Sequence, residues 1–294
     1  MATVALSVDN IDQLSDSQLD LLERQIAGKF MRVVPWSAVV WGLLNCVLFF
    51  ALFPLVLFDA ISEWVAFPIA TLCIMLAYLP SHEAQHNIIA ARGAPLRWLN
   101  ELVGHVSPLP LAFSYRALRA THMQHHAHTN DPELDPDYDI HEAPERGYFL
   151  TYLKQLQPSS KRNDAYGVCL QRIGQPELIF EQALFEIAYL LVLFTMAWTG
   201  YAIEAALLWW LPRMIGLYHT FYYLAREPHT PAEKQGRYAD TRAFRSRFGN
   251  VVSAGMQYHI VHHLYPKIPL RLTPQAYREL RPLLVRRGCD LGDL

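Results

Sequence analysis

The apolar residues of this chain gather in four long stretches separated by short loops or polar segments. The first runs for 23 residues without a charge, enough to cross a bilayer core of about 30 Å. The second is shorter and also uncharged, whereas the other two contain isolated charges. Tight loops, DAISE and TG, join the members of each pair. The pattern predicts an all-α integral membrane fold with four transmembrane helices in two hairpins, at about 36–58, 64–79, 178–199 and 201–224.

The basic residues indicate how these hairpins are oriented. Of the 25 Lys and Arg residues, 24 lie outside the four stretches and outside both tight loops, and the exception is Arg213 in the fourth stretch. Because Lys and Arg accumulate on the cytoplasmic side of a membrane, the N-terminus, the 80–177 loop and the 225–294 tail are expected there. We therefore expect a multi-pass protein of a bacterial inner membrane, with both termini, a helical cap and the active site on the cytoplasmic side.

The segments outside the spans predict further helices. Residues 1–33 carry no signal peptide pattern and form an amphipathic cytoplasmic segment, and 34–294 is interpreted as one catalytic domain. The apolar face of the amphipathic segment is expected to contain Ile11, Leu14, Leu21 and Leu22. The apolar stretch 92–113 is broken by Gly and Pro, which favours a re-entrant or interfacial helix over a full span.

Composition narrows the classes of function. The chain has 294 residues, of which 52% are hydrophobic and 18% charged, with a net charge of −2. It shows no basic stripe with interleaved aromatic residues, so no nucleic-acid partner is expected. The four cysteines are widely spaced and form neither a CxxC pair nor an iron–sulfur pattern. The candidate chemistry therefore rests on the histidines.

Eight of the 13 histidines fall into three clusters, HEAQH, HMQHH and HIVHH. Spacings of three and four residues place side chains on one face of a helix, so each cluster can direct two or three imidazoles at one place. The first cluster follows the second span, and the other two lie in the cytoplasmic loop and tail, so all three can meet at one membrane face. Imidazole is a common ligand of transition metals. The candidate ligands are His82, His86, His122, His125, His126, His259, His262 and His263.

The number of histidines separates the possible metal chemistries. HEAQH matches the HExxH signature of zinc proteases, with Glu83 as the possible base. A catalytic zinc takes three protein ligands and a water, so a protease would leave two clusters unexplained. A metal transporter would place polar ligands at the bilayer midplane, whereas these clusters lie at or beyond its inner boundary. Eight or nine imidazoles suit two metals, although spacing alone does not distinguish iron from other transition metals.

Longer sequence patterns extend the three clusters. The second continues as HMQHHAHTNDPELDPD, the third as HIVHHLYPKIP, and the segment YYLAREPHTP precedes the third. Over roughly residues 36–270 the chain resembles the membrane-bound fatty acid desaturase superfamily, which includes carotenoid hydroxylases and ketolases. It departs from the family pattern at Glu83, where Asp is frequent, and at Asn87, where Gly is common.

The resemblance implies a non-haem di-iron centre that uses O2 and external electrons to desaturate or hydroxylate a long lipid. A fatty acyl chain is the first expectation, because the long 127–177 loop exceeds what a minimal carotenoid ketolase needs. A carotenoid hydroxylase or ketolase is the alternative. The resemblance also implies a ninth ligand, His229, with His219 as the alternative. Electrons would come from a separate donor such as a ferredoxin, a rubredoxin or a cytochrome.

The remaining predictions concern charged residues and isolated histidines. Asp135 and Asp137 follow the second cluster closely and are expected, with Glu83, to accept hydrogen bonds from the ligand imidazoles. For Asp131 in the same turn, a solvated position is favoured. Glu186 and Arg213 lie at similar depth in the third and fourth spans, which predicts an ion pair inside the bundle. A structural role, away from any metal, is expected for His105, His128 and His141.

Overall fold

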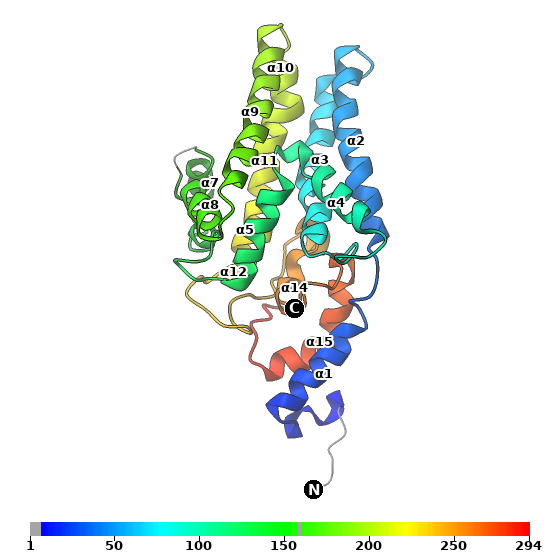
Figure 1. Cartoon of the computed structure of the whole chain (residues 1–294), viewed down its shortest axis with the longest axis vertical. Helices are drawn as coiled ribbons and strands as arrows, with labels where there is room; N and C mark the ends of the chain where they lie inside the picture. The colour runs from blue at the N-terminus through cyan, green and yellow to red at the C-terminus, as the bar shows by residue number, and fades with distance from the viewer. Residues whose placement is uncertain (1–6, 158–159) are drawn as a thin grey trace.

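The computed structural model describes residues 7–157 and 160–294, and the described chain is helical without a strand. Three helices are long and apolar enough to cross a membrane: α2 (Trp36–Leu57), α3 (Glu63–Gln85) and α9 (Glu177–Trp198). All three lie in the upper part of the molecule, where α2 packs against α3 (Figure 1). Membrane-compatible helices and the absence of strands from the described residues agree with the predicted all-helical membrane class.

The fourth expected span, 201–224, is one continuous helical path but not one regular helix. It consists of α10 (Ala202–Ala205), the π-turn η3 (Ala206–Trp210), α11 (Leu211–Thr220), the π-turn η4 (Phe221–Arg226) and α12 (Glu227–His229). Each π-turn precedes a proline, Pro212 or Pro228. Proline has no N–H to donate to the carbonyl four residues earlier, and that carbonyl lies within the π-turn in both cases. The path therefore widens at two points that a hydropathy pattern does not reveal.

Helix α3 is the centre of the bundle, and it packs against α2 on one side and α11 on the other. Small residues permit this approach. A Cβ atom at Gly42 of α2 would lie 2.8 Å from Cβ of Pro80 in α3, and a Cβ at Gly216 of α11 would overlap Ile74. Cβ atoms essentially never come that close, so the two glycines set how near the helices stand.

The predicted pair between Glu186 and Arg213 is confirmed. Nη2 of Arg213 lies 2.5 Å from Oε1 of Glu186, and Nε of Arg213 donates to the Leu111 carbonyl at 2.8 Å. The guanidinium also lies 4.6 Å from the ring centroid of Tyr189. The pair joins α9 to α11, as the similar depths of the two residues predict.

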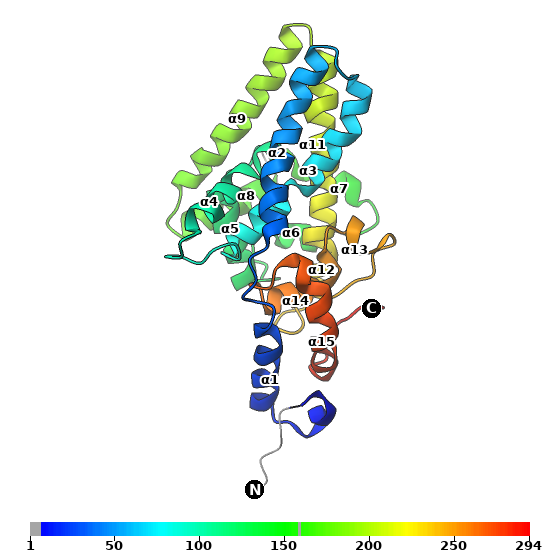
Figure 2. The same cartoon turned by 90° about the vertical axis from the view of Figure 1, so that its right-hand side faces the viewer.

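The shorter helices form a cap beneath and beside the long ones, and both termini lie below them (Figure 2). They include η1 (Val8–Gln13), α1 (Asp16–Gly28), α4 (Arg97–Val106), η2 (Leu109–Leu111), α5 (Tyr115–Ala127), α6 (Tyr138–His141), α7 (Tyr148–Gln155) and α8 (Lys161–Arg172). The C-terminal part contributes α13 (Gly249–Val252), η5 (Met256–Tyr258), α14 (His259–Leu264), η6 (Leu270–Leu272) and α15 (Thr273–Arg286). The stretch 92–113 contains only the short helices α4 and η2.

Helix α1 packs against α15, so a helix of the N-terminal part contacts a helix of the C-terminal part. Its buried apolar face contains Leu19, Leu22 and Ile26, whereas Leu21 is 49% exposed. The expected face was therefore wrong at Leu21. The capping box of Ser15 and Gln18 starts the helix at Asp16. Gln18 thus takes part in the cap at the start of the helix.

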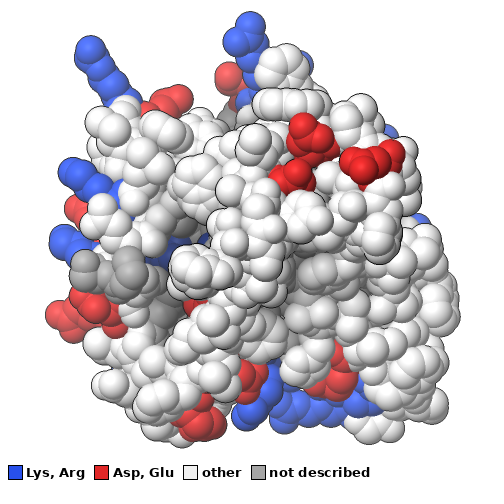
Figure 3. Space-filling view, turned by 90° about the horizontal axis from the view of Figure 1, so that it is seen from above, with Lys and Arg blue, Asp and Glu red and all other residues white. Residues whose placement is uncertain are grey.

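Seen from the hairpin tips, the protein surface is largely uncharged (Figure 3). Acidic groups are visible at several places on this face, and most of the Lys and Arg side chains in view extend at its edge. The tips contain Asp59 and Glu63 in one loop and Glu204 just after the other. This distribution agrees with the sequence pattern from which the orientation was predicted.

Candidate metal centre

The three histidine clusters come together where α3, α5 and α14 meet. Helix α3 carries His82 and ends at Gln85, so His86 follows directly as its C-cap. Helix α5 carries the second cluster and α14 the third. The end of the broken fourth path, α12, adds His229. Four segments that are distant in the sequence therefore supply imidazoles to one region.

Within this region the imidazoles form two groups. In each group, one potential ligand atom per residue can be chosen so that all lie within 4.8 Å of one another. The first group is His82, His86, His122, His126 and His262. The second group is His125, His229, His259 and His263. His125 and His126 are adjacent in the sequence but belong to different groups, and so do His262 and His263. The reason is that successive side chains on a helix point about 100° apart.

The imidazole nitrogens face one another at short range. Nε2 of His122 lies 2.8 Å from Nε2 of His86 and 3.1 Å from Nε2 of His126. In the second group, Nε2 of His229 lies 3.1 Å from Nε2 of His259. A nitrogen pair at this distance needs a proton or a cation between its lone pairs. Each group therefore presents several lone pairs toward one small volume.

Burial keeps these rings neutral. Burial, together with the neighbouring histidines, lowers the pKa well below its ordinary value in His122, His126, His229, His259, His262 and His263. Neutral imidazole is the form that binds metals. Nε2 of His263 is also buried without a hydrogen-bond partner, while Nδ1 of that ring contacts Thr129. The donor set and this unpartnered nitrogen fit two transition-metal ions.

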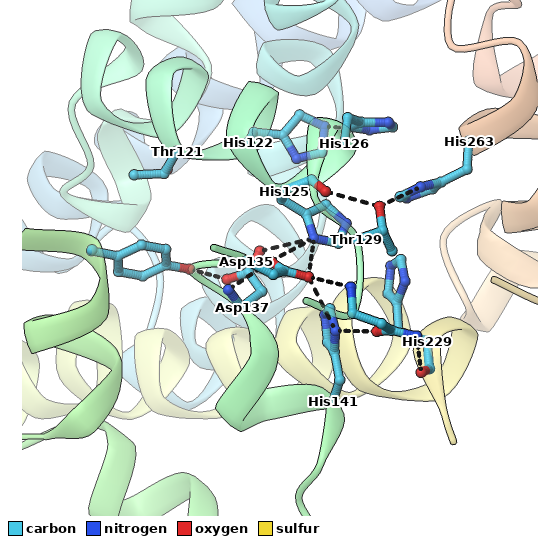
Figure 4. Close-up of polar contacts among 12 residues, drawn as sticks. Thr121, His122, His125, His126, Thr129, Asp135, Asp137, His141, His229 and His263 are labelled. Carbon is cyan, nitrogen blue, oxygen red and sulfur yellow. Dashed lines mark hydrogen bonds and ion pairs between the residues drawn. The ribbon is translucent and has the colours of Figure 1, made fainter. Parts of the chain in front are cut away.

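One carboxylate orients the second group. Nδ1 of His125 lies 3.1 Å from Oδ1 and 3.2 Å from Oδ2 of Asp135 (Figure 4). The backbone N–H groups of Asn130 and Asp137 also donate to this buried carboxylate. Burial opposes ionisation of Asp135, but the adjacent His125 and His141 bring its pKa below the ordinary value. Asp135 thereby holds a proton on Nδ1 of His125 and leaves Nε2 free to face the second group.

Of the expected acceptors, Asp135 is the one that contacts a ligand imidazole, whereas Asp137 and Glu83 do not. Oδ2 of Asp137 lies 3.9 Å from Nδ1 of His125, beyond hydrogen-bond distance, and Oδ1 of Asp137 accepts from the Tyr166 hydroxyl. Oε1 of Glu83 accepts from the backbone N–H of Leu270 at 2.8 Å. Asp137 therefore has no direct hydrogen bond to His125. Glu83 connects α3 to the segment after the third cluster.

His219 and His229 have different surroundings. Nε2 of His219 lies 2.5 Å from the carbonyl oxygen of Val252, and this residue belongs to neither group. His229 is buried within the second group, where its ring lies 4.8 Å from that of His263. The π-turn η4 and Pro228 bring the end of the fourth path to this position.

His141 is the residue that sequence reasoning missed. Its Nδ1 lies 2.8 Å from Oδ1 of Asn130 and 3.6 Å from Oδ2 of Asp135. Its ring stacks on His229 with centroids 4.3 Å apart, and burial lowers the pKa of His141 to about 3. Nε2 of His141 has no partner. No local spacing marks this histidine, because only the packing of α6 against η4 brings it here.

A cavity of about 640 Å³ leads away from the histidines. His82 and His122 of the first group and His125 and His259 of the second line it. Its wall continues along α5, α8, α9 and α11 to Ile187 and Leu190 of α9. Figure 3 shows the surface hollowed beside the long helices, with basic atoms visible inside the hollow. The volume is in the range that holds a small organic ligand.

Comparisons with known proteins agree with this geometry. The model of the fatty acid desaturase family matches residues 62–291, which contain all three histidine clusters and the cavity.

Relatives of two kinds are found. An sn-1 oleoyl-lipid 12-desaturase of Anabaena variabilis is 36% identical over 86 residues, 28% of this chain and 23% of that protein. A protein of the same name from Arthrospira platensis is 23% identical over 269 residues, 79% of this chain and 74% of that protein. A beta-carotene ketolase of Haematococcus lacustris is 26% identical over 212 residues, 68% of this chain and 58% of that protein.

Proposed function

The chain belongs to the fatty acid desaturase family, and from this membership we propose that it is an O2-dependent di-iron oxidoreductase that desaturates or hydroxylates a fatty acyl chain. The observation that carries the proposal is the pair of imidazole groups at the end of an apolar-walled cavity. Family membership and the relatives support an oxidoreductase acting on a lipid.

The nine imidazoles of the two groups are proposed as the metal ligands, with His229 as the ninth. Its position between His259 and His263 favours it over His219, which contacts the Val252 carbonyl. A bound iron pair supplies dioxygen activation and the oxidation of an unactivated C–H bond. All-imidazole ligation leaves the positive charge of such ions unneutralised. The protein contributes fixed ligand directions, a carboxylate that holds His125, and a cavity that positions the lipid.

The membrane arrangement is also a proposal. We propose that the path from α10 to η4 is the fourth span beside α2, α3 and α9, and that the bacterial inner membrane surrounds the bundle. The histidines and both termini would then face the cytoplasm, where the chain carries most of its Lys and Arg residues. Reducing equivalents would come from a separate ferredoxin, rubredoxin or cytochrome, because the oxidation consumes two electrons beyond those of the substrate.

A carotenoid ring is the second candidate substrate. The observation in its favour is the beta-carotene ketolase of Haematococcus lacustris, which matches over 68% of this chain. The HExxH protease hypothesis has less support, since Glu83 bonds the backbone N–H of Leu270 and the two histidines of HEAQH share their group with three others.

Expression in a host of known lipid content tests the proposal. Mass spectrometry of extracted lipids should reveal an acyl product two hydrogens lighter or one oxygen heavier than its precursor, and the purified protein should contain two iron ions per chain. His125→Ala should abolish the product, whereas His128→Ala should retain it, because His128 lies outside both groups. A zinc-only protein, or equal activity of the two variants, would contradict the proposal.

A further inference from the structure

One cation of the cavity wall, Arg162, makes no ion pair among the described residues. Arg162, in the first turn of α8, lines the cavity and is 8% exposed. Its Nε and Nη1 atoms are buried without a hydrogen-bond partner, and Nη2 donates to Oδ1 of Asn163 at 3.3 Å. The second cation of the cavity wall, Arg213, differs because Glu186 neutralises it.

The surroundings of Arg162 compensate its charge only in part. The guanidinium carbon lies 4.6 Å from the ring centroid of Phe221, a cation–π contact that provides no hydrogen-bond acceptor. The buried Asp137 carboxylate accepts from the Tyr166 hydroxyl and forms no ion pair with Arg162, although the two charges attract one another at longer range. A buried guanidinium with unused N–H donors is strongly unfavourable unless an anion or several acceptors complete it. Because Arg162 lines a cavity, a ligand bound there is the candidate source of the missing acceptors.

The cavity also has an apolar side that opens toward the bilayer. Ile187 and Leu190 of α9 line the cavity and are 51% and 57% exposed on the molecule's surface. Of the three long helices, α9 is the least covered by protein, with 11% of its apolar window buried against 39% in α2 and α3. A hydrocarbon chain can therefore lie against α9 while a polar group reaches α8.

From this arrangement, and resting on the proposed function, we propose that Arg162 binds the oxyanion head group, a carboxylate or a phosphate, of a single-chain acyl substrate whose hydrocarbon part occupies the cavity. A charged acceptor matches the unused N–H donors of the guanidinium, and arginine is well suited to both oxyanions. A carotenoid hydrocarbon would fill the same cavity and leave the buried charge without an acceptor. The cavity therefore selects an acyl amphiphile over the second candidate substrate.

Binding to the purified, iron-loaded protein tests this proposal without measuring turnover. The probes are oleate, 1-oleoyl lysophosphatidate and oleyl alcohol, which share one hydrocarbon chain and differ in the head group. Wild-type protein should bind at least one anion about 10-fold or more tightly than the alcohol, because a hydrogen bond to a charged group is stronger than a neutral one. The anion that shows the preference identifies the carboxylate or the phosphate as the head group.

A variant pair locates the effect. Arg162→Gln should weaken binding of the preferred anion by about 10- to 100-fold and leave oleyl alcohol within twofold. Lys161→Gln, one residue earlier and exposed, should change neither. Equal affinity of wild-type protein for anions and alcohol overturns the proposal even if Arg162→Gln fails to fold. An equal loss of affinity for all three probes in Arg162→Gln also overturns the proposal. An unchanged affinity of this variant for the preferred anion does so as well.

The same data separate this inference from the proposed function. Head-group selection through Arg162 in a protein that yields no oxidised lipid would leave the binding site standing and reject the oxidase. An active oxidase with no head-group preference would support the proposed function and reject the role of Arg162.

Discussion

Asp135 contacts His125 through both carboxylate oxygens, at 3.1 and 3.2 Å from Nδ1, and thereby fixes the imidazole that links α5 to the second histidine group. A buried carboxylate in this position raises the basicity of the ring and sets the nitrogen that faces the metal. The four-residue helix α6 begins just after Asp137, so the acidic turn that holds His125 also directs His141 toward His229.

Replacement of Asp135 by Asn should weaken metal binding. The change removes the charge that stabilises the orientation of His125, and partners of this kind typically contribute about 10- to 100-fold in affinity. Iron retained after dialysis against graded chelator concentrations measures the effect. Asp137→Asn is the matched control, since its carboxylate lies 3.9 Å from His125 and should lower affinity less. Equal losses in the two variants would reject the distinction between them.

His229→Ala and His219→Ala should differ in metal content. The first removes an imidazole 3.1 Å from His259, so the purified protein should lose iron from the second group. The second removes a contact to the Val252 carbonyl and should retain about the wild-type stoichiometry. Elemental analysis of both proteins decides the outcome. Loss of iron in His219→Ala alone would identify His219, and not His229, as the metal ligand.

The metal-free protein should become less stable as the pH falls. His141 has its pKa lowered from 6.5 to about 3 by burial, so the unfolded state takes up a proton below pH 6.5 that the folded state does not. Stability from this group is fully present above pH 6.5 and is lost toward pH 3, by about 1.4 kcal/mol per pH unit. The ligand candidates whose pKa values burial lowers, such as His122 and His259, act in the same direction.

Thermal unfolding after chelation should therefore show a Tm that declines below pH 6.5. His141→Gln should have a shallower decline between pH 6.5 and 5 than the parent, because it removes one of the titrating groups. His128→Gln is the control, and its curve should run parallel to that of the parent protein. A Tm that rises on acidification would contradict the neutral state of these imidazoles.

The ion pair of Glu186 and Arg213 should show coupling in a double-mutant cycle. Arg213→Met leaves Glu186 uncompensated next to the cavity, and Glu186→Leu leaves the guanidinium with only the Leu111 carbonyl and the Tyr189 ring. Each single change should cost less than the ~3–5 kcal/mol typical of a fully buried pair, because Glu186 is 37% exposed. The double variant should be more stable than the sum of the two losses predicts. Additive losses in detergent-solubilised protein would show that the pair is not coupled.

The helical path from α10 to α12 has irregularities that the hydropathy pattern does not predict. Hydropathy marks 201–224 as one apolar stretch, but the missing N–H groups of Pro212 and Pro228 widen the helix twice. The second widening lies just before His229 and helps to set which histidine of the path reaches His259. Spacing along the sequence contains no such information, since both His219 and His229 lie near the C-terminal end of the stretch.

By itself, the sequence determined the helical membrane class, the three histidine clusters and the pairing of Glu186 with Arg213, because helical periodicity and depth in a span are local properties. The tertiary structure decided how nine imidazoles divide into two groups, which carboxylate holds His125, and that His141 belongs beside them. Those outcomes depend on the directions of side chains from helices far apart in the chain. Such directions are fixed by the packing of α3, α5, α6 and α14 around one buried volume.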